Sequence, residues 1–161
     1  MLRFVLAIAV VACSPSAKHE DGSTLPVHDP EPAAPQGPQP RVFVHSPSGD
    51  LAVTVEVVST PAKIGQGLMY RQHLPPEAGM LFLMGYENDW QFYMRNTLIP
   101  LDIIFIKKDM TIAGIVENAE PRTETLRQVG LPSLYVLEVN GGWTAAHKVA
   151  AGAAVRFDNV R

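Results

Sequence analysis

The sequence predicts a mainly β domain, a compact β-sandwich or barrel with two short helices. Short runs of β-branched and aromatic residues recur along the chain, for example RVFVHS at 41–46 and LYVLEV at 134–139. Glycine, proline, asparagine and aspartate separate these runs and mark turns. Helix signals occur in only two short segments. A chain of many short strands joined by turns is typical of a sandwich or a barrel.

The domain begins with a predicted hairpin and a short helix. RVFVHS and DLAVTVEVVST (50–60) alternate β-branched and other residues on either side of the turn signal PSGD. Thr60 then offers a helix N-cap, and Pro61 suits the first helical position. We therefore expect a helix that starts at Pro61 and ends at the glycines of GQG.

The remaining elements follow the same logic. After the loop LPPEAG we expect further strands at MLFLM (80–84), WQFYMRNT (90–97), LDIIFIK (101–107), MTIAGIVEN (110–118), LYVLEV (134–139) and AAVRF (153–157). A short helix near WTAAHKVAAG, ended by Gly152, precedes the last of them. The total is eight strands and two helices.

The first twelve residues, MLRFVLAIAVVA, have the pattern of a secretory signal peptide. Arg3 precedes an unbroken apolar run from Phe4 to Ala12, which is shorter than the roughly 20 residues a membrane-spanning helix needs. The run ends in VVAC, which resembles the bacterial lipobox, and Cys13 is the single cysteine of the chain. We therefore expect cleavage at residue 12 and acylation of Cys13, for example by palmitate. The alternative is an unmodified Cys13 in a leader that is not cut there.

Residues 13–40 are expected to form a lipidated, disordered, proline-rich linker. The stretch 14–40 carries serine, glycine, aspartate and glutamate with few large apolar side chains, so it cannot bury a core. Such a linker would hold one folded β domain, residues 41–161, away from the membrane. These features predict an exported lipoprotein whose domain faces the periplasm or the exterior of a bacterial cell envelope.

Composition argues against several partner classes. The net charge of -3 and the pI of about 5.9 provide no basic surface for nucleic acid. The five histidines are not spaced as zinc ligands, so we expect no metal and no cofactor. Methionine thioethers can bind Cu(I), which leaves a copper site at the methionines as a minor alternative to core filling. The oligomeric state cannot be derived from the sequence.

Polar residues interrupt the apolar run WQFYMRNTLIPLDIIFI (90–106). Asp102 shares a strand face with two isoleucines, and Glu138 in VLEVN repeats the pattern beside Val136. A carboxylate on an apolar face must be paired or must lie beside water or a ligand, because an isolated buried charge is very unfavourable. Arg71 and Arg95 are the candidate partners of Asp102.

Several short motifs occur together in this chain. GLMYR, GMLF, FYMRNT, PLDIIFI and VLEVN, in this order and spacing, resemble the bacterial and archaeal family known as domain of unknown function 192. The similarity runs from about residue 53 to 157. It implies a small jelly-roll-like β-sandwich and brings no settled activity with it.

The candidate pocket or polar network consists of Arg71, Asn96, Thr97, Asp102, Glu138 and Asn140. One interpretation is a concave site for a small polar ligand, such as a saccharide or an amino-acid-like molecule. The other is a buried network, with Arg71 bridging an acid, that fixes the fold and binds nothing.

Three functions remain open at this point. The preferred hypothesis is a non-catalytic small-ligand-binding or accessory module at the cell envelope. A second is a hydrolase acting on a polar or saccharide substrate, with Asp102 and Glu138 as acid and base if they lie about 5 to 9 Å apart. A third is a structural or protein-interaction domain. No catalytic residue is assigned.

Overall fold

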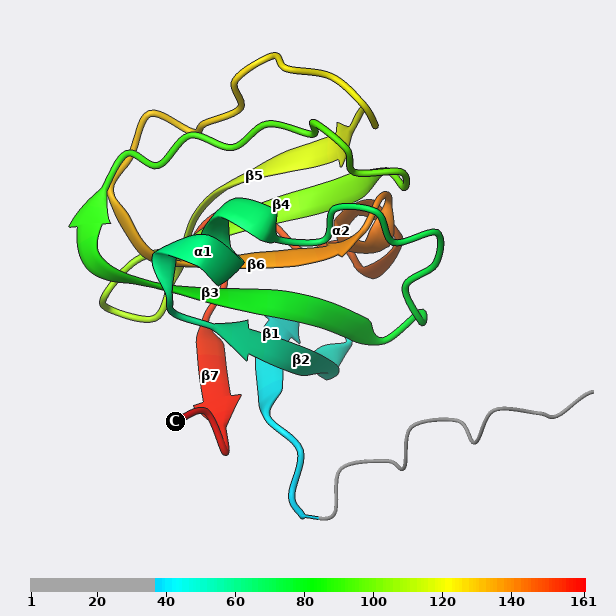
Figure 1. The fold of residues 1–161 in the computed structure, drawn as a ribbon. Helices are drawn as coiled ribbons and strands as arrows, with labels where there is room; N and C mark the ends of the chain where they lie inside the picture. Colours follow the sequence, from blue (N-terminus) through cyan, green and yellow to red (C-terminus); the bar gives the residue numbers. More distant parts are fainter. Residues whose placement is uncertain (1–36) are drawn as a thin grey trace, which may run out of the picture. The chain divides into compact units, whose positions relative to one another are not determined.

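The computed structural model describes residues 37–161 (Figure 1). The expected signal peptide and Cys13 lie outside this range, as does most of the expected linker. Seven strands and two helices make up the described part. The strands are β1 (Arg41–Ser46), β2 (Gly49–Val58), β3 (Ala78–Asn88), β4 (Leu101–Ile106), β5 (Ile112–Ala119), β6 (Ser133–Asn140) and β7 (Val155–Asp158); the helices are α1 (Pro61–Gln66) and α2 (Trp143–His147).

All seven strands belong to one sheet, in the order β5-β4-β6-β3-β2-β1-β7. The sheet curls into a half-barrel, so the prediction of a mainly β domain with two short helices is confirmed. Neighbouring strands are antiparallel except β2 and β3, which run parallel. A parallel pair needs a crossover connection, and α1 with the loop after it supplies this crossover.

Both faces of the sheet are buried along its centre, because all six residues of β4 are inaccessible. One face packs the cluster that contains Ile104, Leu137 and Trp143, and α2 closes this side. The opposite face packs a second cluster, which contains Phe82 and Phe105. Helix α1 lies over β3 and β6 on that second face (Figure 1).

Helix α1 begins as the sequence predicts. Thr60 is the N-cap, its hydroxyl accepts a hydrogen bond from the backbone N–H of Lys63, and Pro61 opens the helix. The helix ends at Gly67, whose φ is +49°. Helix α2 ends earlier than expected, at Lys148 in the left-handed region instead of near Gly152.

The strand expected at 90–97 is wrong. This segment is extended but makes only one bridge, between Phe92 and Arg127, and it turns at Asn96, where φ is +58°. Trp90 and Met94 nevertheless join Phe92 in packing on the second core cluster. The alternation of apolar and polar residues in this segment therefore indicates an extended chain with one face toward the core. Such a chain need not form a hydrogen-bonded strand pair.

No helix within residues 37–161 is long and apolar enough to cross a membrane.

Candidate functional site

Asp102 is a fully buried structural acceptor. Its Oδ1 accepts hydrogen bonds from the backbone N–H groups of Asn118 (2.8 Å) and Gly142 (2.9 Å), and its Oδ2 accepts from the N–H (2.8 Å) and hydroxyl (2.6 Å) of Thr144. Gly142 is the N-cap of α2 and has no side chain to cap the helix itself. Asp102 thus satisfies the free N–H groups at the start of α2 from the neighbouring strand β4.

Asp102 and Glu138 lie on opposite faces of the sheet. In the β4–β6 register, Asp102 pairs with Val139, and Ile103 pairs with Glu138. Paired residues share a face and successive residues alternate, so the two carboxyl groups point in opposite directions. They cannot flank one scissile bond. The hydrolase hypothesis with these residues as acid and base is therefore wrong.

Arg71 contacts neither of these acids. Its Nη2 donates to Oε2 of Glu56 at 2.7 Å, and its Nη1 donates to the other oxygen of the same carboxylate. The side chains are 36% and 54% exposed. The hydrogen bond from Arg71 lowers the pKa of Glu56, and burial opposes this effect. The pair is a bidentate ion pair at the surface.

Asn96 and Asn140 hold loops in place. Asn96 adopts a left-handed backbone conformation, and its Nδ2 donates to the hydroxyl of Tyr70 at 2.9 Å. The Nδ2 of Asn140 donates to the carbonyl oxygens of Leu74 and Pro75 at 3.0 and 3.1 Å. These two hydrogen bonds of Asn140 fix the loop before β3 against the end of β6.

Thr97 and Glu138 are the two members of the predicted set that line one cavity. This cavity, the Glu138 pocket, has a volume of about 230 Å³. Residues of α1 and the turn after it form one wall, β3 and β6 form the floor, and the segment before β4 forms the opposite wall. The lining residues are Ile64, Gly65, Gln66, Gly67, Leu68, Met69, Phe82, Met84, Trp90, Gln91, Phe92, Tyr93, Thr97 and Glu138.

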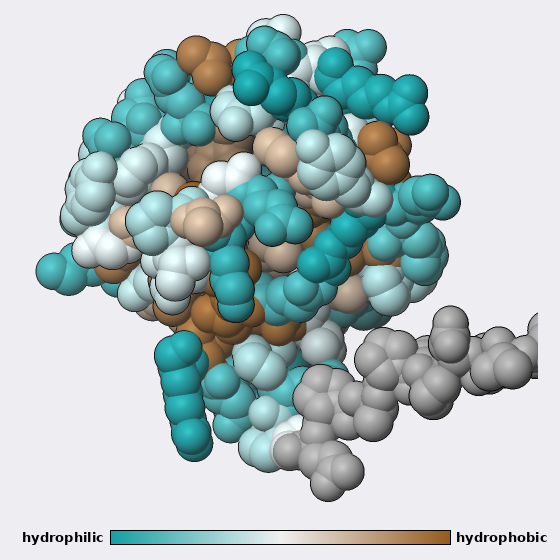
Figure 2. Space-filling view, in the orientation of Figure 1, coloured by the Kyte–Doolittle hydropathy of each residue, from teal (hydrophilic) through white to brown (hydrophobic). Residues whose placement is uncertain are grey.

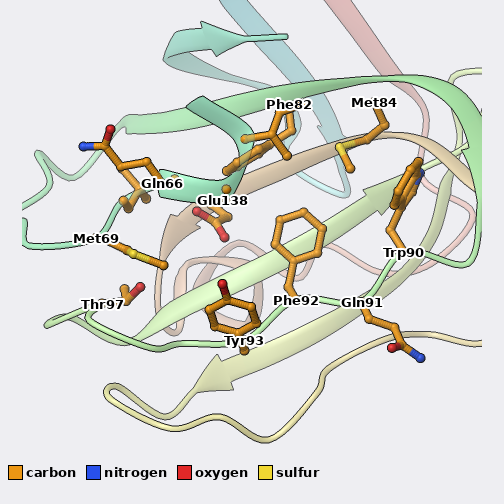
Figure 3. A pocket seen from close by; sticks show the side chains of 14 residues that line it. Gln66, Met69, Phe82, Met84, Trp90, Gln91, Phe92, Tyr93, Thr97 and Glu138 are labelled. Carbon is orange, nitrogen blue, oxygen red and sulfur yellow. The ribbon is translucent and has the colours of Figure 1, made fainter. Parts of the chain in front are cut away.

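The carboxyl group of Glu138 is the unusual feature of this pocket. Glu138 is 6% exposed, and within residues 37–161 its buried Oε2 has no hydrogen-bond partner. Burial raises the pKa of Glu138 to about 8, because transfer out of water disfavours the charged form. A buried polar atom without a partner is rare in folded proteins. In Figure 3 the carboxyl group of Glu138 lies beside Phe82 and Phe92.

Aromatic rings surround the carboxyl group. Phe82 and Phe92 meet edge to face, with ring centroids 5.4 Å apart, and Tyr93 points its hydroxyl toward Glu138 (Figure 3). Trp90 lies at the far end and donates through its Nε1 to the carbonyl oxygen of Ser133 at 3.1 Å. Gln66, Gln91 and Tyr93 are exposed, so the pocket opens where they lie. On this side of the domain, hydrophilic residues dominate and apolar residues show between them (Figure 2).

The methionines do not gather around one point. Met69 and Met84 line the pocket at opposite ends (Figure 3), whereas Met80 and Met94 are buried core residues. The described residues contain no cluster of three histidine, cysteine, aspartate or glutamate side chains that could hold a metal ion.

Two neighbouring hollows contain Arg71. The larger, of about 360 Å³, lies between residues 37–40 and the start of β3, and a smaller one lies between β2 and α1. Glu56 lines both and is already paired with Arg71. The larger hollow therefore offers no free charged group, and the smaller one adds only Lys63, which is exposed on α1. The Glu138 pocket, with its buried carboxyl group, is the better candidate.

The sequence did not reveal the aromatic and methionine residues of the pocket as site residues. Trp90, Phe92 and Met84 follow the apolar alternation of core positions, and no local feature distinguishes a cavity wall from a packed core. An available signal was the density of aromatic residues between 90 and 93, next to a loop.

The comparison with known families agrees with the motifs. The model of domain of unknown function 192 (DUF192), described as an uncharacterized ACR, matches residues 43–157. The chain belongs to the DUF192 family. The match runs from β1 to β7, so both the Asp102 network and the Glu138 pocket lie within the DUF192 domain. No curated protein shows a significant match to the chain.

Solved structures similar to this DUF192 domain include two bacterial proteins. One is a protein from Sinorhizobium meliloti 1021 that is provisionally named a transcription regulator; it has a TM-score of 0.71 and 38% identity, over 74% of this chain and 94% of that one. The other is a protein of unknown function from Novosphingobium aromaticivorans DSM 12444; it has a TM-score of 0.70 and 40% identity, over 72% of this chain and 83% of that one.

Proposed function

We propose that this DUF192 domain is a non-catalytic binding module for a small ligand, and that the ligand occupies the Glu138 pocket. The observation that supports this most directly is that Glu138 lines the pocket while the buried Oε2 of its carboxyl group has no hydrogen-bond partner in the described residues. Leaving a buried acceptor unpaired costs about 1–3 kcal/mol, so a group retained in this state is a candidate for a partner that is not part of the chain.

The contrast with Asp102 strengthens this argument. Asp102, on the same sheet, receives four donor contacts from three residues of β5 and the start of α2. Glu138, one register step away on the adjacent strand, receives none at Oε2. The fold therefore satisfies one buried carboxyl group internally and leaves the other, which lines a cavity, without a partner at one oxygen.

The size and lining of the pocket limit the ligand. At about 230 Å³ it is smaller than the roughly 300–1,000 Å³ of pockets for drug-sized ligands, so it suits a small molecule or the end group of a larger one. Most lining residues are apolar, and the amide of Gln91 is already bonded to Gln128. A saccharide, which needs several hydrogen bonds, is a poor match to this wall.

The pocket also favours binding over hydrolysis. Glu138 is the only carboxyl group among its lining residues, and histidine, cysteine and serine are absent from that lining. A second acid, or a nucleophile with its base, would be needed for the usual hydrolytic mechanisms.

The proposed binding can be tested by fragment screening with protein-observed NMR. Small aromatic compounds, amines, amino acids and sugars are added to the protein, and amide shifts are recorded. We expect hits to shift residues 64–69, 90–97 and 138 together. Hits that map elsewhere, or a screen without hits, would overturn the proposal.

A pair of variants on α1 controls this experiment. Ile64 is half-buried and lines the pocket, so Ile64→Trp should fill it and abolish binding. Lys63 is exposed and does not line it, so Lys63→Trp should leave binding intact. Equal binding by both variants would contradict the assignment of the ligand to this pocket.

We also propose that the domain works at the cell envelope, anchored through acylated Cys13. The apolar run before Cys13 and the proline-rich stretch after it support this location. Regulation of transcription, suggested by the name of the S. meliloti relative, receives no support from the net charge of -3.

A further inference from the structure

The position of Glu138 limits the chemistry of its ligand beyond size. Its carboxyl group lies among the rings of Phe82, Phe92 and Tyr93, and lysine, arginine and histidine are absent from the pocket lining. A group placed beside it must supply hydrogen-bond donors to an acid in an apolar setting. An anion would be repelled by the carboxylate form and would find no cation in the lining.

We infer that the Glu138 pocket takes an organic cation, whose N–H donors face the Glu138 carboxylate and whose apolar body lies against the aromatic rings. This inference rests on the proposed function, because it names the ligand class of the same pocket. Amidinium and guanidinium groups fit best, since they combine N–H donors for a carboxylate with a planar, weakly hydrated shape that stacks on aromatic rings. Aromatic faces attract a desolvated cation and replace part of its lost hydration.

The aromatic residues are not equally free to contribute. The guanidinium of Arg95 lies 5.2 Å from the centroid of the Tyr93 ring, so the Tyr93 ring already makes a cation–π contact within the chain. Phe92 and Trp90 are half-buried pocket residues with no such contact among the described side chains. The charged group is therefore expected beside Glu138 and Phe92, with the apolar body of the ligand extending toward Trp90.

Other titratable groups do not replace Glu138 in this role. The elements packed on this side of β6 carry Lys63, Glu56, Tyr70, Arg71, His73, Tyr86, Glu87, Asp89, Tyr93, Arg95, Glu120, Arg122, Glu124 and Arg127. Only Tyr93 lines the pocket. Glu56 is paired with Arg71, and Arg95 with Glu124, while Asp102 faces the other side of the sheet.

Binding a cation should displace the proton of Glu138. Burial raises the pKa of Glu138 to about 8, so about nine-tenths of the molecules hold this proton at pH 7 and about one-tenth at pH 9. A cation that needs the carboxylate should thus bind roughly tenfold tighter at pH 9 than at pH 7. A neutral ligand that accepts a hydrogen bond from the protonated acid should instead bind more weakly at pH 9.

The probe for this test is benzamidinium, with benzamide as its neutral isostere. Amidines are strong bases, so benzamidinium stays charged over this pH range. Isothermal titration calorimetry on the full chain at pH 7 and pH 9 measures both affinities. Titrations at pH 7 in phosphate and in Tris, which differ in ionisation enthalpy, measure the proton released.

We expect benzamidinium to bind, to bind tighter at pH 9, and to release close to one proton per molecule at pH 7. In Glu138→Gln, which keeps the size of the side chain, we expect loss of the pH dependence and of the preference over benzamide. If that variant fails to fold, the proton release by the unaltered protein still decides the question.

The outcomes separate the two proposals. Benzamide binding as tightly as benzamidinium, or benzamidinium binding without proton release, would overturn the inference of a cationic ligand. The proposal of a small-ligand-binding function would be unaffected. Benzamidinium failing to bind while other fragments occupy the pocket would do the same. A pocket that binds neither these probes nor any fragment would overturn both proposals.

Discussion

Gly79 on β3 lies against the backbone of Glu138 on β6. A Cβ atom added at Gly79 would lie 2.5 Å from the carbonyl oxygen of Glu138, and 3.2 Å from side-chain atoms of Val139 and Val53. Because backbone atoms cannot rotate away, only glycine allows β3 and β6 to approach this closely. This approach holds Glu138 at the floor of the pocket.

The first prediction follows from this contact. Gly79→Ala should lower the free energy of unfolding by about 3 kcal/mol or more, because the added methyl group meets backbone. Gly65 is the control, since a Cβ there meets nothing within 4 Å. Gly65→Ala should be neutral or stabilising by about 0.5–1 kcal/mol, as Gly65 lies within α1. Urea denaturation measures both, and equal stabilities of the two variants would contradict the close approach.

The second prediction separates the two buried acids by stability. Asp102→Asn should lower the free energy of unfolding by about 3 kcal/mol or more. The amide group would place its own N–H donors against the N–H groups from which Asp102 now accepts hydrogen bonds. Glu138→Gln at neutral pH should change stability by less than about 1 kcal/mol, because Oε2 loses no hydrogen bond. Thermal or urea unfolding of both variants checks this difference. A Glu138→Gln protein as unstable as Asp102→Asn would show that Glu138 also braces the fold.

The third prediction concerns pH. The pKa of Glu138 is raised by burial from its ordinary value of 4.5 to about 8, so between these values the folded protein holds a proton that the unfolded chain has released. The contribution of this group is therefore fully present below about pH 4.5 and is lost as the pH rises to about 8. The slope is at most about 1.4 kcal/mol per pH unit. The Glu138→Gln variant lacks this contribution. All other titratable groups are common to the variant and the unaltered protein, so their effects cancel when the two unfolding free energies are subtracted. The difference in unfolding free energy between the two should change by at least about 2 kcal/mol from pH 5 to pH 8, and a constant difference would refute the assignment.

The fourth prediction places Arg71 outside the pocket. Arg71→Gln should cost no more than about 1 kcal/mol, because its ion pair with Glu56 is exposed. It should raise the pKa of Glu56, since the hydrogen bond from Arg71 is the main cause of the present lowering. NMR titration of the Glu56 carboxyl group tests this, and benzamidinium affinity should stay unchanged. A large loss of benzamidinium affinity in Arg71→Gln would show that Arg71 contributes to the Glu138 pocket.

The fifth prediction concerns the N-terminus. Cys13→Ser should abolish labelling by radioactive or clickable palmitate and release the protein from membranes or leave it unprocessed, because the thiol is the expected acylation site. Membrane fractionation with gel analysis measures this. Serine substitutions within the linker, such as Ala17→Ser, should have no effect. Labelled fatty acid in the Cys13→Ser protein would contradict the lipobox interpretation.

The sequence by itself determined the elements that depend on local chemistry. Alternation of β-branched residues predicts the hairpin of β1 and β2, and Thr60 with Pro61 predicts the start of α1. The linked motifs also identified the family, since residues 43–157 match the DUF192 model. These features lie within a few neighbouring residues or in their order along the chain, so they can be read without coordinates.

Only the tertiary structure decided how the polar residues are used. The sequence of a strand shows which of its residues share a face. It does not show which side of the sheet this face will form. The β4–β6 register places Asp102 and Glu138 on opposite sides, where α2 supplies donors to one and a cavity faces the other. Strand order and register arise from contacts between residues far apart in the chain, and such contacts leave no local pattern in the sequence.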